Sequence, residues 1–129
     1  MRIGLDFDNT VVNTTNFPHI GETVSGCVET LKELVNNGHK LMLFTQREHV
    51  SYNGVEDILD IAVQWFNENG IELFTVNEND PELTKKYYES KKPGYQFLID
   101  DRNLGAKLDE NGCVDWCWVR EELTKIGAL

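Results

Sequence analysis

Asp6-Phe7-Asp8-Asn9-Thr10 closes an apolar run, residues 3–7, near the start of the chain. Side chains alternate along a strand, so the run predicts a strand, and a turn at its end would bring both carboxylates to one spot. Two close anions repel each other strongly at a low effective dielectric. The pair therefore predicts a divalent cation, and carboxylate, carbonyl and water oxygens favour Mg²⁺.

Length and composition predict one domain, residues 1–129, because the chain can bury a core and has little left for a second module. Hydrophobic residues make up 40% and charged residues 26% of the chain, as in ordinary globular proteins. The formal net charge of −10 argues against tight nucleic-acid binding through bulk electrostatics. A local basic patch is compatible with this charge.

The first residues contain no long apolar segment, so we expect no signal peptide, and no stretch has the length of a membrane span. The three cysteines, Cys27, Cys113 and Cys117, are an odd number in a chain without secretory features. Reduced thiols and a cytoplasmic protein without membrane contact are the expectation.

Apolar runs alternate with amphipathic stripes along the rest of the chain. The expected helices begin near Thr23, Val55 and Asp80, and a last short one spans residues 121–126. The further strands are expected at residues 41–45, 71–76, 95–99 and 113–119. This alternation predicts an α/β fold, a doubly wound, Rossmann-like and mostly parallel sheet of about five strands with helices on both faces.

Polar residues follow several of these strands directly. Ligands bind outside the carboxyl ends of the strands in such sheets. The expected site therefore combines five residues from three strand ends: Asp6, Asp8, Thr45, Asp100 and Asp101.

Four motifs in this order resemble the haloacid dehalogenase (HAD) superfamily of phosphotransferases. They are Asp-x-Asp-x-Thr at residues 6–10, Leu43-Phe44-Thr45, Lys92, and Ile99-Asp100-Asp101. The resemblance is strong for the first and last motifs and weak for the lysine. It implies a Mg²⁺-dependent phosphatase, a phosphohydrolase acting on phosphate monoesters through an aspartyl-phosphate intermediate.

The resemblance also implies a role for each matching residue. Asp6 is the nucleophile, and Asp8 protonates the leaving alcohol and then takes a proton from water. The Asp6 carboxylate, the Asp8 carbonyl and Asp100 hold Mg²⁺, with Asp101 as a more distant or water-mediated ligand. Thr45 and a lysine hold the phosphoryl oxygens.

The lysine is open among four candidates, Lys85, Lys86, Lys91 and Lys92, and spacing favours Lys92. Arg47 adds a guanidinium fork suited to phosphate, although a solvated loop arginine is an equal alternative.

Larger members of the family carry a cap domain inserted after the first motif or between the second and third motifs. We expect no cap domain in this chain, because residues 9–22 are long enough only for a flap and core elements occupy most of residues 46–91. The resemblance leaves the phosphorylated substrate open: sugar phosphates, nucleotides and phosphorylated nucleic-acid ends are all candidates. An oligomer is compatible. Receiver domains use similar residues, but they place the adjacent acidic pair at the first strand. The alternative of another class is a non-catalytic HAD-like binding or regulatory protein.

Overall fold

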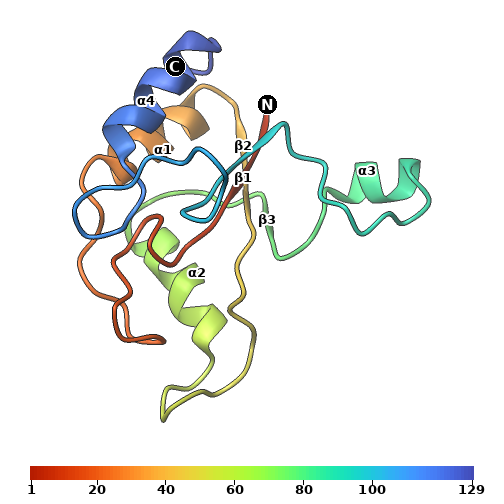
Figure 1. The fold of residues 1–129 in the computed structure, drawn as a ribbon. Helices are drawn as coiled ribbons and strands as arrows, with labels where there is room; N and C mark the ends of the chain where they lie inside the picture. The colour runs from red at the N-terminus through yellow and green to blue at the C-terminus, as the bar shows by residue number, and fades with distance from the viewer.

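A computed structural model describes all residues, 1–129. Four parallel strands form one sheet in the order β3-β2-β1-β4. Figure 1 labels β1, β2 and β3 of this sheet. The strands are short: β1 is Arg2–Leu5, β2 is Lys40–Leu43, β3 is Thr75–Val76 and β4 is Phe97–Ile99. The order reverses beside β1, since β2 and β3 follow on one side and β4 on the other. The expected α/β fold with a parallel sheet is confirmed.

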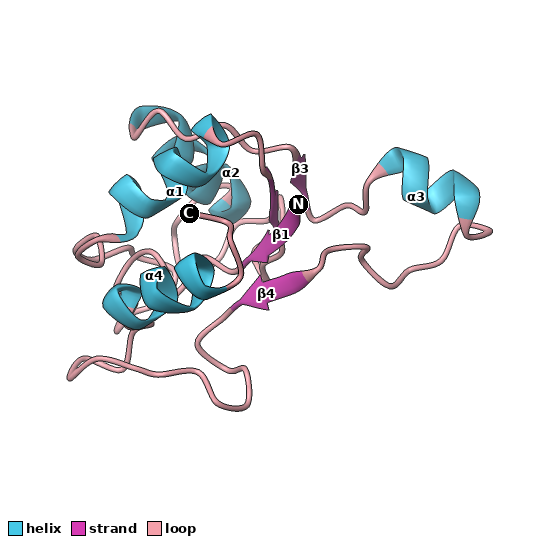
Figure 2. Cartoon of the chain, turned by 90° about the horizontal axis from the view of Figure 1, so that it is seen from above, coloured by secondary structure: helices cyan, strands magenta, loops and turns pink.

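Three helices cover one face of this sheet: α1 (Cys27–Asn36), α2 (Ile58–Glu68) and α4 (Trp116–Lys125). Figure 2 shows them on the same side of the strands. Each buries an apolar stripe, as the helical spacing in the sequence predicts. The stripes share one core with alternate strand residues, among them Ile3, Leu5, Leu41, Leu43 and Ile99.

The expected strand over residues 113–119 is wrong, whereas the helix expected over residues 121–126 is present but begins earlier, at Trp116. One helix, α4, occupies most of this segment, so the sheet has four strands rather than about five. Asp115 explains the error, because its carboxylate accepts hydrogen bonds from the N–H groups of Cys117 and Trp118 and so caps a helix. Trp116 and Trp118 alternate with polar or small residues, which is typical of a strand, but the cap at Asp115 favours a helix.

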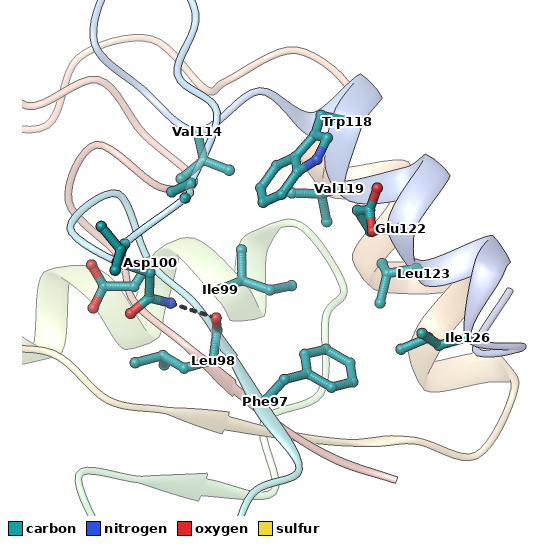
Figure 3. Close-up of a pocket in the computed structure, with 14 residues that line it drawn as sticks. Phe97, Leu98, Ile99, Asp100, Val114, Trp118, Val119, Glu122, Leu123 and Ile126 are labelled. Atoms are coloured by element: carbon teal, nitrogen blue, oxygen red, sulfur yellow. Dashed lines mark hydrogen bonds between the residues drawn. The ribbon is translucent and has the colours of Figure 1, made fainter.

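The outer edge of β4 has no neighbouring strand, and an apolar hollow of about 380 Å³ lies there between β4 and α4 (Figure 3). The Asn103 side chain donates a hydrogen bond of 2.7 Å to the Leu98 carbonyl. An added strand would need this carbonyl as a hydrogen-bond acceptor, so the bond hinders pairing at this edge. Sheet edges are often protected against unwanted strand pairing in this way.

The second face of the sheet lacks a packed helix, which corrects the expectation of helices on both faces. The remaining helix, α3 (Pro81–Lys86), has no buried residue and projects away from the strands on this side (Figure 2). On this face the Tyr95 ring packs directly against Gly4. A Cβ at position 4 would lie only 2.7 Å from the ring, so the close contact requires glycine. The buried carboxylate of Asp80 pairs with Arg2 and fixes the start of α3.

The segment between β1 and α1 forms a flap, residues 9–22, with little regular structure. The N–H of Asn13 donates to the Glu22 carbonyl, and the N–H of Gly21 donates to the Asn13 carbonyl. The flap therefore folds back on itself over the carboxyl end of β1. No helix in the structure is both long and apolar enough to span a bilayer.

Candidate metal and phosphate site

The first turn after β1 places Asp6 and Asp8 at the edge of the sheet. The Phe7 carbonyl accepts hydrogen bonds from the N–H groups of Thr10 and Val11, which closes the turn directly after the strand. Two groups from the end of the chain hold this turn: the N–H of Val114 donates to the Asn9 carbonyl, and the Trp116 indole donates to the Thr10 carbonyl at 2.7 Å. The turn is therefore fixed from both the sheet and α4.

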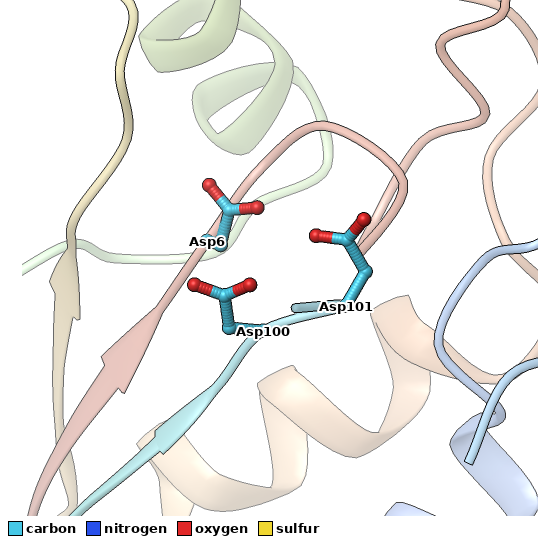
Figure 4. Close-up of side chains that lie close together, drawn as sticks. All are labelled: Asp6, Asp100 and Asp101. Atoms are coloured by element: carbon cyan, nitrogen blue, oxygen red, sulfur yellow. The ribbon is translucent and has the colours of Figure 1, made fainter. Parts of the chain in front are cut away.

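Three carboxylates converge beside this turn. Asp6 follows β1, while Asp100 and Asp101 follow β4, and β1 and β4 are neighbours in the sheet. One oxygen from each carboxylate lies within 4.8 Å of the others (Figure 4). Their convergence agrees with the sequence-based expectation.

Burial and mutual repulsion disfavour the charged forms of these carboxylates. Burial raises the pKa of Asp6 to about 7; the N–H of Phe7 opposes this shift, and the charges of Asp100, Asp101 and Asp8 add to it. Burial and the neighbouring Asp100 also raise the pKa of Asp101. The charge of Arg102 partly offsets the shift at Asp101. Three carboxylates gathered at neighbouring strand ends form a donor set that fits a hard divalent ion.

Asp8 lies beside the three carboxylates and binds Arg47. The Arg47 Nε donates to Asp8 Oδ2 at 2.9 Å and Nη2 donates to Oδ1 at 2.7 Å, a two-pronged pair. Thr14 Oγ1 donates to the same Oδ1 at 2.8 Å. Since Oδ2 accepts one bond and Oδ1 accepts two, Oδ2 keeps more free acceptor capacity.

Arg47 differs from the sequence-based expectation of a phosphate ligand. Its side chain is 0% exposed, and it also donates to the carbonyls of Ile58 and Pro18. The guanidinium carbon lies 5.1 Å from the centroid of the Phe7 ring and 4.9 Å from that of Phe17. Arg47 thus joins Asp8 to the flap and to the start of α2, and it does not face the open site.

Thr45 reaches the site from the end of β2, as expected. Its N–H donates to the Asn77 side-chain oxygen, and its Oγ1 accepts a bond from the N–H of Arg47. The hydroxyl hydrogen therefore stays available for a ligand. Asn77, which sequence reasoning missed, also donates to the Arg47 carbonyl and fixes this loop. Its place directly after β3 was a usable signal.

A polar hollow of about 470 Å³ opens above these groups. Its lining includes Asp6, Asp8, Thr45, Asp101 and Arg102. Lys92 does not line this hollow; it is exposed near α3, where its carbonyl accepts a bond from the Asn79 side chain. The other candidate lysines do not line it either, and Arg102, missed in the sequence, is the arginine at its rim.

The raised pKa of Asp6 predicts a pH-dependent stability in the absence of metal. The folded pKa of about 7 exceeds the value of 3.8 for an unperturbed aspartate, so folding favours the protonated form. The resulting stabilisation is complete below pH 3.8 and is lost as the pH rises through 7. In thermal melts with EDTA, we expect the melting temperature to fall between pH 5 and pH 8.

Two comparisons check this prediction. Asp6→Asn has no titrating group at this position, so its melting temperature should fall less over the same range. Saturating Mg²⁺ should raise the melting temperature of the wild type more at pH 8 than at pH 5. Equal pH profiles for the wild type and the variant would contradict the assignment.

A comparison with solved structures finds a protein similar to this chain. A solved structure, described as a conserved protein coded by a locus of Bacteroides thetaiotaomicron, is 34% identical in sequence to this chain. The similarity covers 98% of this chain and 91% of the other, with a TM-score of 0.76. No protein-family model matches the sequence, and no curated protein matches it significantly.

Proposed function

The chain belongs to the same family as this conserved Bacteroides thetaiotaomicron protein, and from its carboxylate site we propose that it is a Mg²⁺-dependent phosphatase acting through an aspartyl-phosphate intermediate. One observation carries the proposal: oxygens of Asp6, Asp100 and Asp101 lie within 4.8 Å of one another at the ends of adjacent strands. The HAD-like order of motifs in the sequence supports it. The substrate class is a phosphate monoester.

The chain's residues fit a metal of this kind. Asp6, Asp100 and Asp101 offer hard oxygen ligands, and the Asp8 carbonyl lies in the same turn. A bound Mg²⁺ would offset the negative charge of an incoming phosphate beside these carboxylates.

The proposed reaction has two displacements at phosphorus. An Asp6 oxygen attacks and bonds to phosphorus while the ester P–O bond breaks. Asp8 enters this step protonated on Oδ2 and gives that proton to the departing alcohol. Asp8 then takes a proton from water, whose oxygen bonds to phosphorus as the bond to Asp6 breaks. Inorganic phosphate and the alcohol are the products, and both aspartates return to their starting state.

Residues around the two aspartates position the reacting groups in this mechanism. Arg47 and Thr14 fix the Asp8 carboxylate and leave acceptor capacity on Oδ2 for proton transfer. The free hydroxyl hydrogen of Thr45 suits a phosphoryl oxygen, and Arg102 at the rim of the hollow supplies positive charge. In this proposal Arg47 positions Asp8 and does not bind phosphate.

Metal removal tests the proposal directly. We expect hydrolysis of an aryl phosphate such as p-nitrophenyl phosphate in Mg²⁺, and its loss in excess EDTA, with recovery when Mg²⁺ is restored. The measurement is release of the coloured phenol, with thermal melts to show that the protein stays folded.

Undiminished turnover in EDTA would contradict the metal assignment. A non-catalytic binding or regulatory protein is the competing function. It would bind Mg²⁺ and show no turnover of any ester, so the same assay separates the two.

A further inference from the structure

Residues 77–96 connect β3 to β4 and carry α3 away from the rest of the protein (Figures 1 and 2). No residue of α3 is buried, so this helix contributes little to the core. Its tip, residues 85–92, reads Lys-Lys-Tyr-Tyr-Glu-Ser-Lys-Lys and is named here the lysine arm.

The lysine arm concentrates positive charge on an acidic protein. It holds four of the chain's eight lysines and one acidic residue, Glu89, whereas the whole chain has a formal net charge of −10. All four lysines are exposed, and the ion pairs of the structure involve none of them. Unpaired lysines on a projecting segment attract a polyanion while keeping it away from the acidic surface.

Two tyrosines lie among these lysines. The side chain of Tyr88 is 97% exposed and that of Tyr87 is 54% exposed. Lys86 Nζ lies 5.3 Å from the centroid of the Tyr87 ring. Exposed aromatic rings interleaved with cations are the combination that binds single-stranded nucleic acids, because bases stack on the rings while cations contact phosphates.

A hollow extends from the lysine arm to residues that neighbour Thr45. It has a volume of about 660 Å³, and its walls include Phe44, Asn77, Lys85 and Lys91, together with two glutamates, Glu78 and Glu89. Phe44 directly precedes Thr45, and the Asn77 side chain accepts the bond from the Thr45 N–H. The hollow therefore begins beside the strand end that carries Thr45 and extends to the lysines.

We propose that the lysine arm binds the backbone of a single-stranded nucleic acid whose terminal phosphate monoester enters the carboxylate site. This inference rests on the proposed function and names its substrate class. Binding energy from the arm, remote from the reacting phosphorus, would compensate for an open site with few contacts to a small ester. An acidic surface on a second copy of the chain is a different partner, and the test distinguishes it.

The test compares two double variants. Lys85→Gln with Lys91→Gln changes the two lysines that line the hollow; Lys32→Gln with Lys107→Gln changes two exposed lysines elsewhere. Each is assayed on p-nitrophenyl phosphate and on ten-nucleotide single strands of DNA and RNA, phosphorylated at the 5′ or the 3′ end. We expect kcat/KM of the arm variant to fall about 10-fold on at least one of the oligonucleotides and to stay unchanged on the aryl phosphate. The control variant should match the wild type on every substrate.

Binding is measured separately from turnover. Fluorescence anisotropy with labelled strands and the Asp6→Asn protein should show weaker binding after the arm substitutions, with a shallower salt dependence. Tyr88→Ala should weaken binding about 10-fold through lost stacking. Arm-dependent binding without hydrolysis of any ester would support the arm and contradict the phosphatase.

Three results would overturn the proposal. The first is wild-type binding and turnover of the strands by the arm variant, and the second is no binding of any strand by the wild type. The third is a dimer, seen by sedimentation, that the arm substitutions dissociate without an effect on strand binding. That result would assign the lysine arm to a second copy.

Discussion

We expect Asp6→Asn to lower the proposed aryl phosphatase turnover by about 10⁴- to 10⁶-fold, as when a covalent nucleophile is removed. Asparagine keeps the size of the side chain but is a poor nucleophile toward phosphorus. It also removes one of three clustered charges, so the folded state should persist. Turnover is measured by phenol release, and folding by circular dichroism.

Two other aspartate-to-asparagine variants serve as comparisons for Asp6→Asn. Asp8→Asn keeps the nucleophile and removes the acid and base, so we expect a smaller loss of about 10²- to 10⁴-fold. Asp60→Asn changes an aspartate in α2 that does not line the hollow, and it should keep wild-type turnover. Wild-type turnover by folded Asp6→Asn would exclude an aspartyl phosphate at this position.

We expect Arg47→Met to lower the free energy of unfolding by about 3 kcal/mol, the lower end for breaking a buried ion pair. The change leaves Asp8, whose side chain is only 22% exposed, without its cation, and it leaves the carbonyls of Ile58 and Pro18 without this donor. Methionine fills much of the space between the two aromatic rings, so lost polar contacts dominate. Urea denaturation measures the effect.

Arg120→Met is the matched control. Arg120 pairs with Glu33 at 2.6 Å, but the two side chains are 47% and 42% exposed. Solvent screens such a pair, so we expect a change within about 0.5 kcal/mol. Equal urea midpoints for the two arginine variants would mean that the buried pair does not stabilise the fold.

The carboxylate cluster was predictable because it depends on strand ends. An apolar run followed by aspartate occurs at both β1 and β4, and parallel strands bring such ends to one edge. The expected meeting of Asp6 with Asp100 and Asp101 needed no knowledge of side-chain packing. Thr45 follows from the same rule at β2.

Other parts of the structure depend on contacts that a linear pattern does not specify. The role of Arg47 is set by Pro18, Ile58 and Asp8, which come from three separate segments. The missing fifth strand depended on one capping residue, Asp115, outweighing an alternating pattern. The position of Lys92 depended on the path that residues 77–96 take away from the sheet. Neither the helical nor the strand periodicity of apolar residues predicts that path.

The bonds from Val114 and Trp116 to the turn at residues 9–10 have a consequence for folding kinetics. They join groups about one hundred positions apart, and closing so large a loop is slow compared with forming a local helix. The reactive turn should therefore reach its final shape late, after the C-terminal helix docks. During refolding, recovery of turnover should follow the same time course as the change in fluorescence that accompanies burial of the Trp116 indole.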